Sequence, residues 1–324
     1  MLKTVTNICL TALLTTKVVL SADLGEHKKP PASANSLISK VTDCPFMDVA
    51  EYQGGCVADW AIAITKVIRV NYCANNKAMA ALSLSWQDLM CGCTACLASQ
   101  TFPCAGGSVS SGLNYVKTTG IVGGGAAGYS ATTKVDFSGF TGAPTGFGYC
   151  YDYFAKACYL SAQTTTCPQV YYNHTTACPA TCPEGDMKGK KVTDLRAANL
   201  KSAFLTDYSA IKGLTDIQKA AAGTQAIIGY MTVYEDLLSF TGTGVYIHTV
   251  GQSLGMYAVV ILGYGTLNGV DYWDVLAPFG KDINGGNHFK VLKGSNHCNI
   301  EELGYTVTPN TKYQKSSLSQ GQDL

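Results

Sequence analysis

The sequence predicts an α+β protein with two lobes, in which a helical, disulfide-rich first half precedes a β-rich second half. A chain of 324 residues is about twice the usual length of one domain. Residues 60–72 are dense enough in apolar side chains for a buried helix. After residue 182, apolar runs are separated by turns rich in Gly and Asn, which is typical of strands.

The composition excludes several classes of protein. Charged residues make up 14 % of the chain, against about 25 % in an ordinary soluble domain. The 23 basic and 22 acidic side chains nearly cancel, so neither a nucleic-acid partner nor a polybasic membrane patch is expected. The chain is not that of a disordered protein or a coiled coil. Abundant tyrosine, at 19 residues, together with low charge favours interfaces with other proteins.

The N-terminus resembles a secretory signal peptide over residues 1–21. A basic start is followed by a short apolar stretch and by small residues near Ser21 and Ala22. Lys17 interrupts the apolar stretch, and a buried N-terminal helix is the alternative interpretation. No later segment has the roughly 18 uninterrupted apolar residues of a membrane span. We therefore expect a protein of the secretory route, delivered to the extracellular space or to a lysosome-like vacuole.

The cysteines agree with that route. Fourteen are present, and disulfide pairing is the default in an oxidising compartment. Cys9 leaves with the signal peptide, so an odd number remains and one thiol stays outside any bridge. Asn173 begins the chain's sequon and is a predicted glycosylation site. The histidines are scattered along the chain, so we expect no metal and no cofactor.

The predicted organisation has five parts, of which the signal peptide at residues 1–21 is the first. Residues 22–43 form a short polar extension, residues 44–182 the helical disulfide-rich lobe, residues 183–310 a β-rich lobe and residues 311–324 a polar tail. Within the second lobe, residues 225–233, 258–264 and 288–292 are predicted strands.

Several short segments, in order along the chain, resemble the cathepsin B branch of the papain-like cysteine peptidases. The resemblance runs from about Cys44 to about Glu302 and implies a papain-like fold, with a helical left lobe, a β-barrel right lobe and a substrate cleft between them. The segments that carry it are residues 53–60, 84–89, 104–107, 120–124, 233–236, 244–248, 263–265, 268–273 and 296–298.

The resemblance also implies a pattern of disulfides. It leaves Cys298 as the odd thiol, which we interpret as buried and inert. The pairing among Cys91, Cys93 and Cys96 is less certain because that cluster is spaced differently here. The implied pairs are Cys44–Cys73, Cys56–Cys104, Cys91–Cys178, Cys93–Cys96, Cys150–Cys182 and Cys158–Cys167.

The family's catalytic positions hold other residues in this chain. The nucleophilic Cys should lie six residues after the oxyanion-hole Gln and directly before a Trp. Gln53 and Trp60 match, which puts Asp59 at the nucleophile position. A carboxylate at a helix N-terminus can cap the first turn. It is a poor nucleophile toward a peptide, because the mixed anhydride is unstable and the leaving amine needs a proton.

The two other triad positions are changed as well. The resemblance puts Tyr257 in place of the His, and a phenol that titrates near ~10 cannot act as the base at neutral pH. Tyr257 either donates a hydrogen bond to Asp59 across the lobes or fills space. Ala277 replaces the orienting Asn, and a methyl group forms no hydrogen bond. No member of the triad is intact.

Other positions of the cleft follow from the same resemblance. Gly106 and Gly107 match the backbone clamp for an extended substrate, and Phe279 replaces a Trp. Tyr230 stands where a small residue lines the main specificity pocket, so its ring is expected to plug that pocket. The histidines of the cathepsin B occluding loop are missing after Cys158. Residues 22–43 are far shorter than the family's inhibitory propeptide.

These substitutions predict an inactive member of the family that acts as a binding or structural protein with an unidentified protein or peptide partner. One alternative is a hydrolase that pairs Asp59 with a second carboxylate, for which Asp274 is the candidate. Another is a decoy that holds peptides or peptidase inhibitors on Gly106 and Gly107.

Overall fold

The computed structural model describes residues 51, 53–54, 56–75, 84–100, 103–125, 149–152, 178–183, 187–202, 205–223, 225–279 and 288–309. The predicted signal peptide, polar extension and C-terminal tail lie outside these residues, as do Asn173, Cys44 and the Cys158–Cys167 pair. None of the helices described is long and apolar enough to cross a bilayer.

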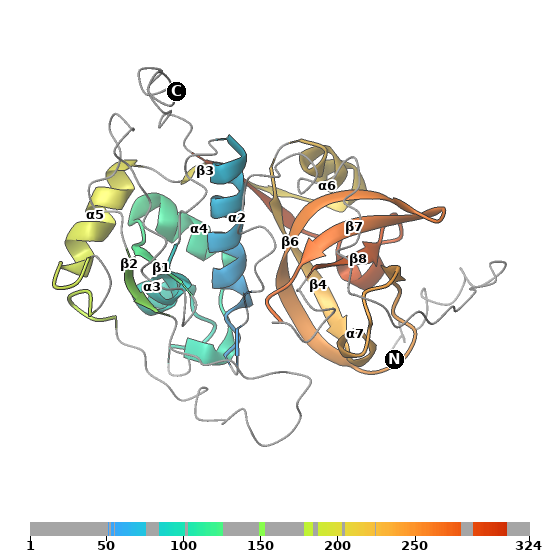
Figure 1. The fold of residues 1–324 in the computed structure, drawn as a ribbon, viewed down its shortest axis with the longest axis horizontal. Helices are drawn as coiled ribbons and strands as arrows, with labels where there is room; N and C mark the ends of the chain where they lie inside the picture. The colour runs from blue at the N-terminus through green and yellow to red at the C-terminus, as the bar shows by residue number, and fades with distance from the viewer. Residues whose placement is uncertain are drawn as a thin grey trace, which may run out of the picture. The chain divides into compact units, whose positions relative to one another are not determined.

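The first half of the chain is helical, as predicted (Figure 1). The predicted helix at residues 60–72 is confirmed and is longer at both ends. Two short strands, β1 (Gly123–Gly125) and β2 (Tyr149–Asp152), pair in parallel beside these helices. The helical elements are α2 (Asp59–Asn75), α3 (Trp86–Gly92), η2 (Thr94–Cys96), η3 (Pro103–Ala105), α4 (Val109–Thr118) and α5 (Val192–Ser202).

The second half forms a seven-stranded sheet in the order β3-β9-β4-β6-β7-β8-β5. The predicted strands are confirmed as β4, β6 and β8, and β6 is more than twice as long as its predicted core. The pairs are antiparallel except β5 with β8. The strands are β3 (Leu205–Ile211), β4 (Ile227–Tyr234), β5 (Val245–Tyr246), β6 (Ser253–Leu267), β7 (Val270–Leu276), β8 (His288–Leu292) and β9 (Gly304–Pro309), with helices α6 (Gly213–Ala221), α7 (Glu235–Leu238) and η6 (His297–Asn299).

The central strands bury both of their faces. In β6, Ala258, Val260 and Leu262 pack in one apolar core with α2, whereas Val259 and Ile261 pack in a second core with α6. Side chains alternate between the faces of a strand, so a strand with two buried faces has a continuous apolar run. This explains why residues 258–262 of the sequence are apolar without a break.

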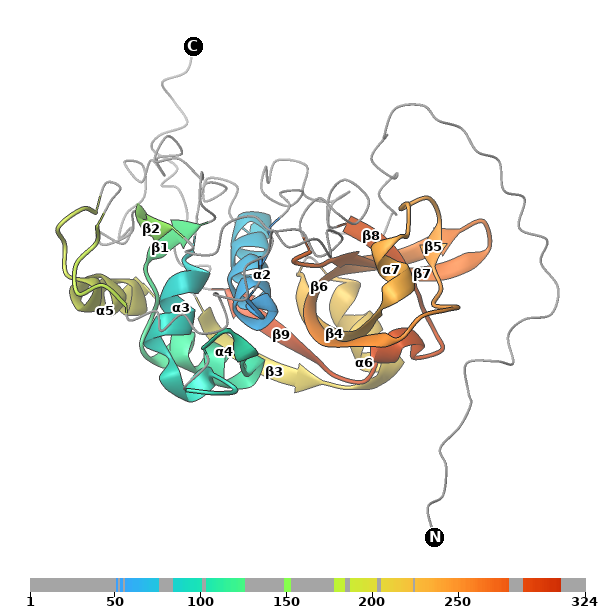
Figure 2. The same ribbon diagram turned by 90° about the horizontal axis from the view of Figure 1, so that it is seen from below.

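Helix α2 lies between the helices of the first half and the sheet (Figures 1 and 2). Its polar side chains are buried together with its apolar ones. Lys66 and Arg69 reach Glu51, at 3.6 Å and 2.8 Å, and all three residues are at most 4 % exposed. A buried charge is tolerated when it is paired, so this cluster ties α2 to Glu51, which precedes the helix in the chain.

Disulfides fasten the helical half. The structure contains Cys56–Cys104, Cys91–Cys178, Cys93–Cys96 and Cys150–Cys182, each a pair that the resemblance implies. Cys73 is also disulfide-bonded, and its expected partner lies outside the described residues. Cys298 remains a thiol and is buried.

The predicted boundary after Cys182 stays a prediction, and the position of α5 bears on it. This helix follows the boundary, yet Arg196 on α5 forms an ion pair with Asp88 of α3. By its contacts α5 therefore belongs with the helical half, and the chain enters the sheet at β3.

Asn71 on α2 is expected to be a major source of stability. Its side chain accepts the N–H of Ala226 and donates to the carbonyls of Ala226 and Val307, and it is fully buried. Asn71→Ala leaves these three backbone groups without their partner, so we expect a loss of about 3 kcal/mol of unfolding free energy. Denaturant titration followed by circular dichroism measures it. Asn114→Ala on the exposed side of α4 is the matched control and should change stability by less than about 0.5 kcal/mol. Equal losses in the two variants would contradict the prediction.

Candidate functional site

The start of α2 is held by Gln53. The side-chain oxygen of Gln53 accepts the backbone N–H of Ala58 at 3.1 Å and that of Asp59 at 3.0 Å. Its own backbone N–H donates to the carbonyl of Pro278 at 3.0 Å. The first N–H groups of a helix have no partner inside the helix, so Gln53 supplies one and links the helix start to the segment after β7.

The carboxylate of Asp59 joins α2 to β6. Its Oδ2 accepts the backbone N–H of Ala258 at 2.6 Å, and the residue is only 5 % exposed. Burial raises the pKa of Asp59 to about 6, and hydrogen bonds from the N–H groups of Ala258, Asp59 and Trp60 oppose that rise. The group therefore changes charge in the mildly acidic range.

Tyr257 and Ala277 lie beside this contact. The ring of Tyr257, the residue before Ala258, packs edge-on against Phe279 with a centroid separation of 5.2 Å. Ala277 is buried directly after β7 and lines a small hollow together with Ala258 and Pro278. Of the two roles expected for Tyr257, the structure shows ring packing. The bond that crosses to Asp59 comes from the main chain of the next residue.

Gly106 and Gly107 bring the backbone against the ring of Trp60. A Cβ on Gly107 would lie 2.4 Å from Cε2 of Trp60, and Gly106 has a φ of +104°. The carbonyl of Gly106 accepts the N–H of Ala98 at 2.9 Å. Glycine is required at both positions, by close approach at Gly107 and by the left-handed backbone at Gly106.

Tyr230 of β4 reaches the start of α4. Its half-buried ring lies edge-on to Tyr305, with centroids 6.5 Å apart, and its phenol forms a hydrogen bond with the backbone of Val109. Burial raises the pKa of Tyr230, and the charges of Tyr305 and Asp59 add to the effect. The phenol is thus neutral at physiological pH and connects the sheet to the helical half.

The carboxylate of Asp274 has a hydrogen-bond partner in His288. Its buried carboxylate on β7 bonds to Nε2 of His288 on β8, and Lys290 of the same strand is its cross-strand neighbour. Burial lowers the pKa of Lys290, and Asp274 opposes that fall. The groups that set the pKa of Asp59 are burial and backbone N–H groups, with no second carboxylate among them.

A polar network around Asp236 is absent from the sequence-based expectations. Although burial acts to raise it, the pKa of Asp236 falls to about 2, because Asp236 accepts the N–H of Thr249 and Val250 and the side chains of Tyr246 and His248. These bonds hold the turn before β6 in one conformation.

The histidines in that network are far apart in sequence. Nε2 of His297 accepts the backbone N–H of His248 at 2.9 Å, across 49 residues. Burial lowers the pKa of His297, and the nearby His248 adds to the effect. In the sequence these histidines look scattered. They lie on two different turns, and no local spacing predicts that those turns meet.

Comparison with known protein families matches residues 39–308 to the papain family of cysteine proteases. The chain belongs to this family. It is similar to two papain-family proteins of Caenorhabditis elegans, cathepsin B-like cysteine proteinase 4 and cathepsin B-like cysteine proteinase 5. It is 29 % identical to the first over 263 residues, which cover 80 % of this chain and 70 % of that protein. It is 28 % identical to the second over 277 residues, which cover 82 % and 71 %.

Solved structures of papain-family proenzymes show the same two-lobe α+β fold. Procathepsin B S9 from Trypanosoma congolense superposes with a TM-score of 0.60 at 23 % identity, over 87 % of this chain and 79 % of that one. Procathepsin L2 from the larval midgut of Tenebrio molitor gives 0.53 at 19 % identity, over 87 % and 69 %. The predicted fold class is therefore confirmed.

The papain-family site makes stability depend on pH through Asp59. Because its pKa of about 6 in the folded chain exceeds the ordinary value of 3.8, the folded state binds this proton more tightly than the unfolded state. The buried charge therefore costs about 3 kcal/mol above pH 6, and the cost disappears as the pH falls toward 4. In Asp59→Asn that dependence is lost, so wild type should gain stability relative to the variant between pH 7.5 and pH 4.5.

Denaturant titrations at a series of pH values measure the difference between the two proteins. Asp207→Asn is the matched control. The hydrogen bond from Lys117 holds the pKa of Asp207 below its ordinary value of 3.8, so this group stays charged from pH 7.5 to pH 4.5 and its replacement should leave the pH dependence of stability unchanged. A stability difference between wild type and Asp59→Asn that stays constant with pH would overturn the assignment.

Proposed function

We propose that this papain-family protein is a cathepsin B-like pseudopeptidase that acts by binding rather than by catalysis. The observation that carries the proposal is the buried carboxylate of Asp59, at the start of α2, bonded to the main chain of β6. Sequence motifs put Asp59 at the nucleophile position, Tyr257 at that of the base and Ala277 at that of the orienting amide.

The chemistry at these positions does not support acyl transfer. A cysteine peptidase needs a thiolate paired with an imidazolium. Asp59 instead uses its carboxylate as an acceptor for backbone N–H groups. A phenol and a methyl group stand where the imidazole and the amide are needed. The arrangement stabilises the junction of α2 and β6 and offers no nucleophile to a peptide.

The oxyanion hole is altered too. In the family, a Gln side chain and backbone N–H groups stabilise the oxyanion. Here the oxygen of Gln53 accepts the N–H of Asp59 at 3.0 Å. That N–H group is therefore engaged within the protein, and it is not aimed at a substrate oxygen.

The alternative hydrolase with two carboxylates has less support. Such an enzyme needs a second acid within about 10 Å that can exchange protons with the first. Asp274, the candidate, is bonded to His288. Asp59 itself has its lone pairs directed at backbone donors.

A peptide decoy is the second candidate function. Gly106 and Gly107 carry no side chains, and the backbone of Gly107 runs close past the ring of Trp60. A backbone without side chains can pair with an extended peptide. Tyr230 opposes this use, because its ring fills the space between β4 and the start of α4. Titration with extended peptides and with protein inhibitors of the family tests it.

Exposed apolar side chains favour a protein partner. Four large apolar residues of the described chain are exposed, and all of them lie within residues 247–256: Ile247, Val250, Leu254 and Met256. Val250 is 69 % exposed and Met256 57 %. Asp236 fixes the backbone of this turn, so these side chains are presented on a rigid support. We call this group the 247–256 patch. Apolar side chains that are exposed together within one segment favour an interaction site there.

Secretion completes the proposal. The signal peptide expected over residues 1–21 leads the chain into the oxidising route in which its bridges form. Asn173 would carry a glycan there. The extracellular space and a lysosome-like vacuole are both reached this way, and protonation of Asp59 suits the more acidic of the two.

The unaltered protein is expected to hydrolyse no peptide. Fluorogenic peptide substrates tested from pH 4.5 to 7.5 should show the same background for wild type and Asp59→Ala. The triple variant Asp59→Cys/Tyr257→His/Ala277→Asn regains thiol, imidazole and amide, and it should turn over substrate above that background. Loss of a triad member costs about 10⁴–10⁶ in rate. Robust peptide hydrolysis by wild type that is lost in Asp59→Ala would contradict the proposal.

The 247–256 patch is expected to carry partner binding. Val250→Ser/Met256→Ser removes its two most exposed side chains and should abolish capture of a stoichiometric partner from the secreted fraction, measured by affinity purification and mass spectrometry. The melting temperature should stay unchanged, because neither side chain is buried. Thr118→Ser, at an exposed site on α4, is the control. A partner retained equally by both variants would place the binding surface elsewhere.

A further inference from the structure

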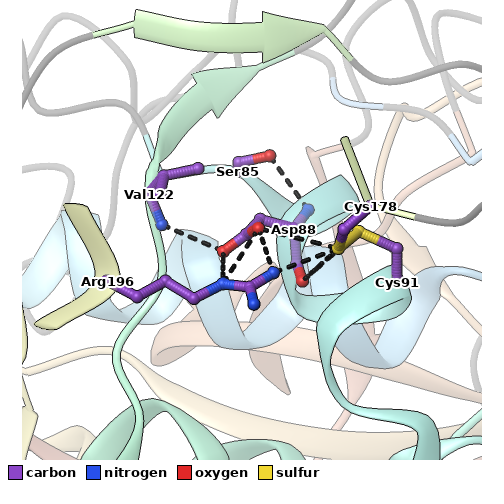
Figure 3. The surroundings of a disulfide bond; sticks show 6 residues. All are labelled: Ser85, Asp88, Cys91, Val122, Cys178 and Arg196. Carbon is purple, nitrogen blue, oxygen red and sulfur yellow. Dashed lines mark hydrogen bonds and ion pairs between the residues drawn. A yellow bond between two sulfur atoms is a disulfide. The ribbon is translucent and has the colours of Figure 1, made fainter. Parts of the chain in front are cut away.

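Charged side chains surround the bridge between Cys91 and Cys178. Figure 3 shows Asp88 and Arg196 beside its sulfur atoms. Asp88 is fully buried on α3 and accepts the N–H of Val122 at 3.1 Å. Nε of Arg196 donates to Oδ2 of Asp88 at 3.0 Å, and Nη2 donates to Oδ1 at 2.5 Å. The guanidinium is thereby fixed in position.

The same guanidinium touches one sulfur of the bridge. Nη2 of Arg196 lies 3.0 Å from Sγ of Cys178. A terminal nitrogen of guanidinium carries two hydrogens, so one can serve Asp88 and the other Cys178. Both sulfurs lie near the backbone oxygen of Asp88, at 3.7 Å for Cys91 and 3.9 Å for Cys178, so this oxygen does not distinguish them. Sγ of Cys178 also lies 3.9 Å from Oδ1 of Asp88, but the guanidinium nitrogen at 3.0 Å is its nearer neighbour. A cationic donor next to a sulfur stabilises its thiolate, whereas a carbonyl oxygen does not.

The site is built for this close approach. A Cβ on Gly92 would lie 2.6 Å from Nη2 of Arg196 and 2.5 Å from Oη of Tyr115. The missing side chain at residue 92, directly after Cys91, therefore leaves room for Arg196 to reach the bridge.

Solvent reaches this bridge more readily than its neighbours. Cys91 and Cys178 are both half-buried. The other cysteines with a described bridging partner are at most 5 % exposed: Cys56, Cys104, Cys93, Cys96, Cys150 and Cys182. Among the bridges described, Cys91–Cys178 therefore combines access with a stabilised leaving group, the two conditions for thiol–disulfide exchange.

We propose that Cys91–Cys178 is a thiol–disulfide exchange site that takes a small thiol or a protein thiol. The incoming thiolate attacks Sγ of Cys91 and forms a mixed disulfide there. The bond between Cys91 and Cys178 breaks, and its electron pair leaves on Cys178 as a thiolate beside Arg196. A second thiolate then attacks the sulfur of the bound thiol, which releases an oxidised disulfide and leaves Cys91 reduced.

Exchange has a structural consequence. The bridge connects residues 87 apart in the sequence, and it ties the end of α3 to the segment at 178–183. Opening it releases that tie, while the buried bridges keep the helical half folded. The exchange does not involve Asp59, so the proposal holds whether or not the protein cleaves peptides.

Partial reduction of the native, oxidised protein tests the proposal. Glutathione at low millimolar concentration and pH 7.5 is followed by acid quenching, iodoacetamide labelling and peptide mass mapping. Cys91 and Cys178 should open at least about tenfold faster than the buried bridges, with the glutathione adduct on Cys91. Equal rates for all bridges, or an adduct mainly on Cys178, would overturn the proposal.

Variants separate the role of Arg196 from a structural one. Asp88→Asn/Arg196→Gln removes both charges together, so no buried charge is left without its partner. Exchange should slow about tenfold and the adduct should distribute over both cysteines, because neither sulfur is then the better leaving group. A folding defect has the opposite effect, since it speeds reduction of every bridge. Lys117→Gln, which removes the cation of the exposed pair with Asp207, is the control and should leave the rates unchanged. An unchanged rate and adduct position in the double variant would refute the role of Arg196.

Discussion

The burial of α2 from Asp59 to Cys73 is the constraint on which the rest of the structure depends. Most polar groups on a helix without a solvent-facing side need a partner, because an unsatisfied buried group costs several kcal/mol. Nε1 of Trp60 is an exception among the described residues. At the start of the helix, Gln53 accepts the N–H of Asp59, and Asp59 accepts the N–H of Ala258. In its middle, Lys66 and Arg69 pair with Glu51. Near its end, Asn71 bonds to the backbone of Ala226. Each of these partners lies outside the helix or links it to another element.

The same constraint supports the proposed pseudopeptidase site. In an active papain-family enzyme the start of the central helix carries a reactive group that must face substrate. We propose that Asp59 occupies that place, and its carboxylate bonds to the backbone N–H of Ala258 in β6. The side chain at this position therefore links the helix to the sheet by a hydrogen bond. Tyr230 adds a second link between the sheet and the helical half, at Val109.

Much of the fold could be predicted from the sequence. The apolar run at residues 60–72 indicates a buried helix, and the runs at 225–233 and 258–264 indicate strands. The disulfide pairs required resemblance to a family, because spacing alone leaves many pairings open. The candidate site was placed by its flanking motifs. Its contacts could not be predicted, since the donor to Asp59 is a backbone N–H that every residue type supplies.

The sequence by itself determined which side chains follow the motifs of the candidate site, and the proposed loss of peptidase activity rests on them. Tertiary structure alone decided what those side chains contact. Asp59 and Ala258 are 199 residues apart, Asp88 and Arg196 are 108 apart, and His248 meets His297 through two separate turns. Such contacts depend on how whole helices and strands pack, which no local sequence pattern encodes. Packing sets the distances between these groups and their burial, and these two quantities decide what a carboxylate or a sulfur can do.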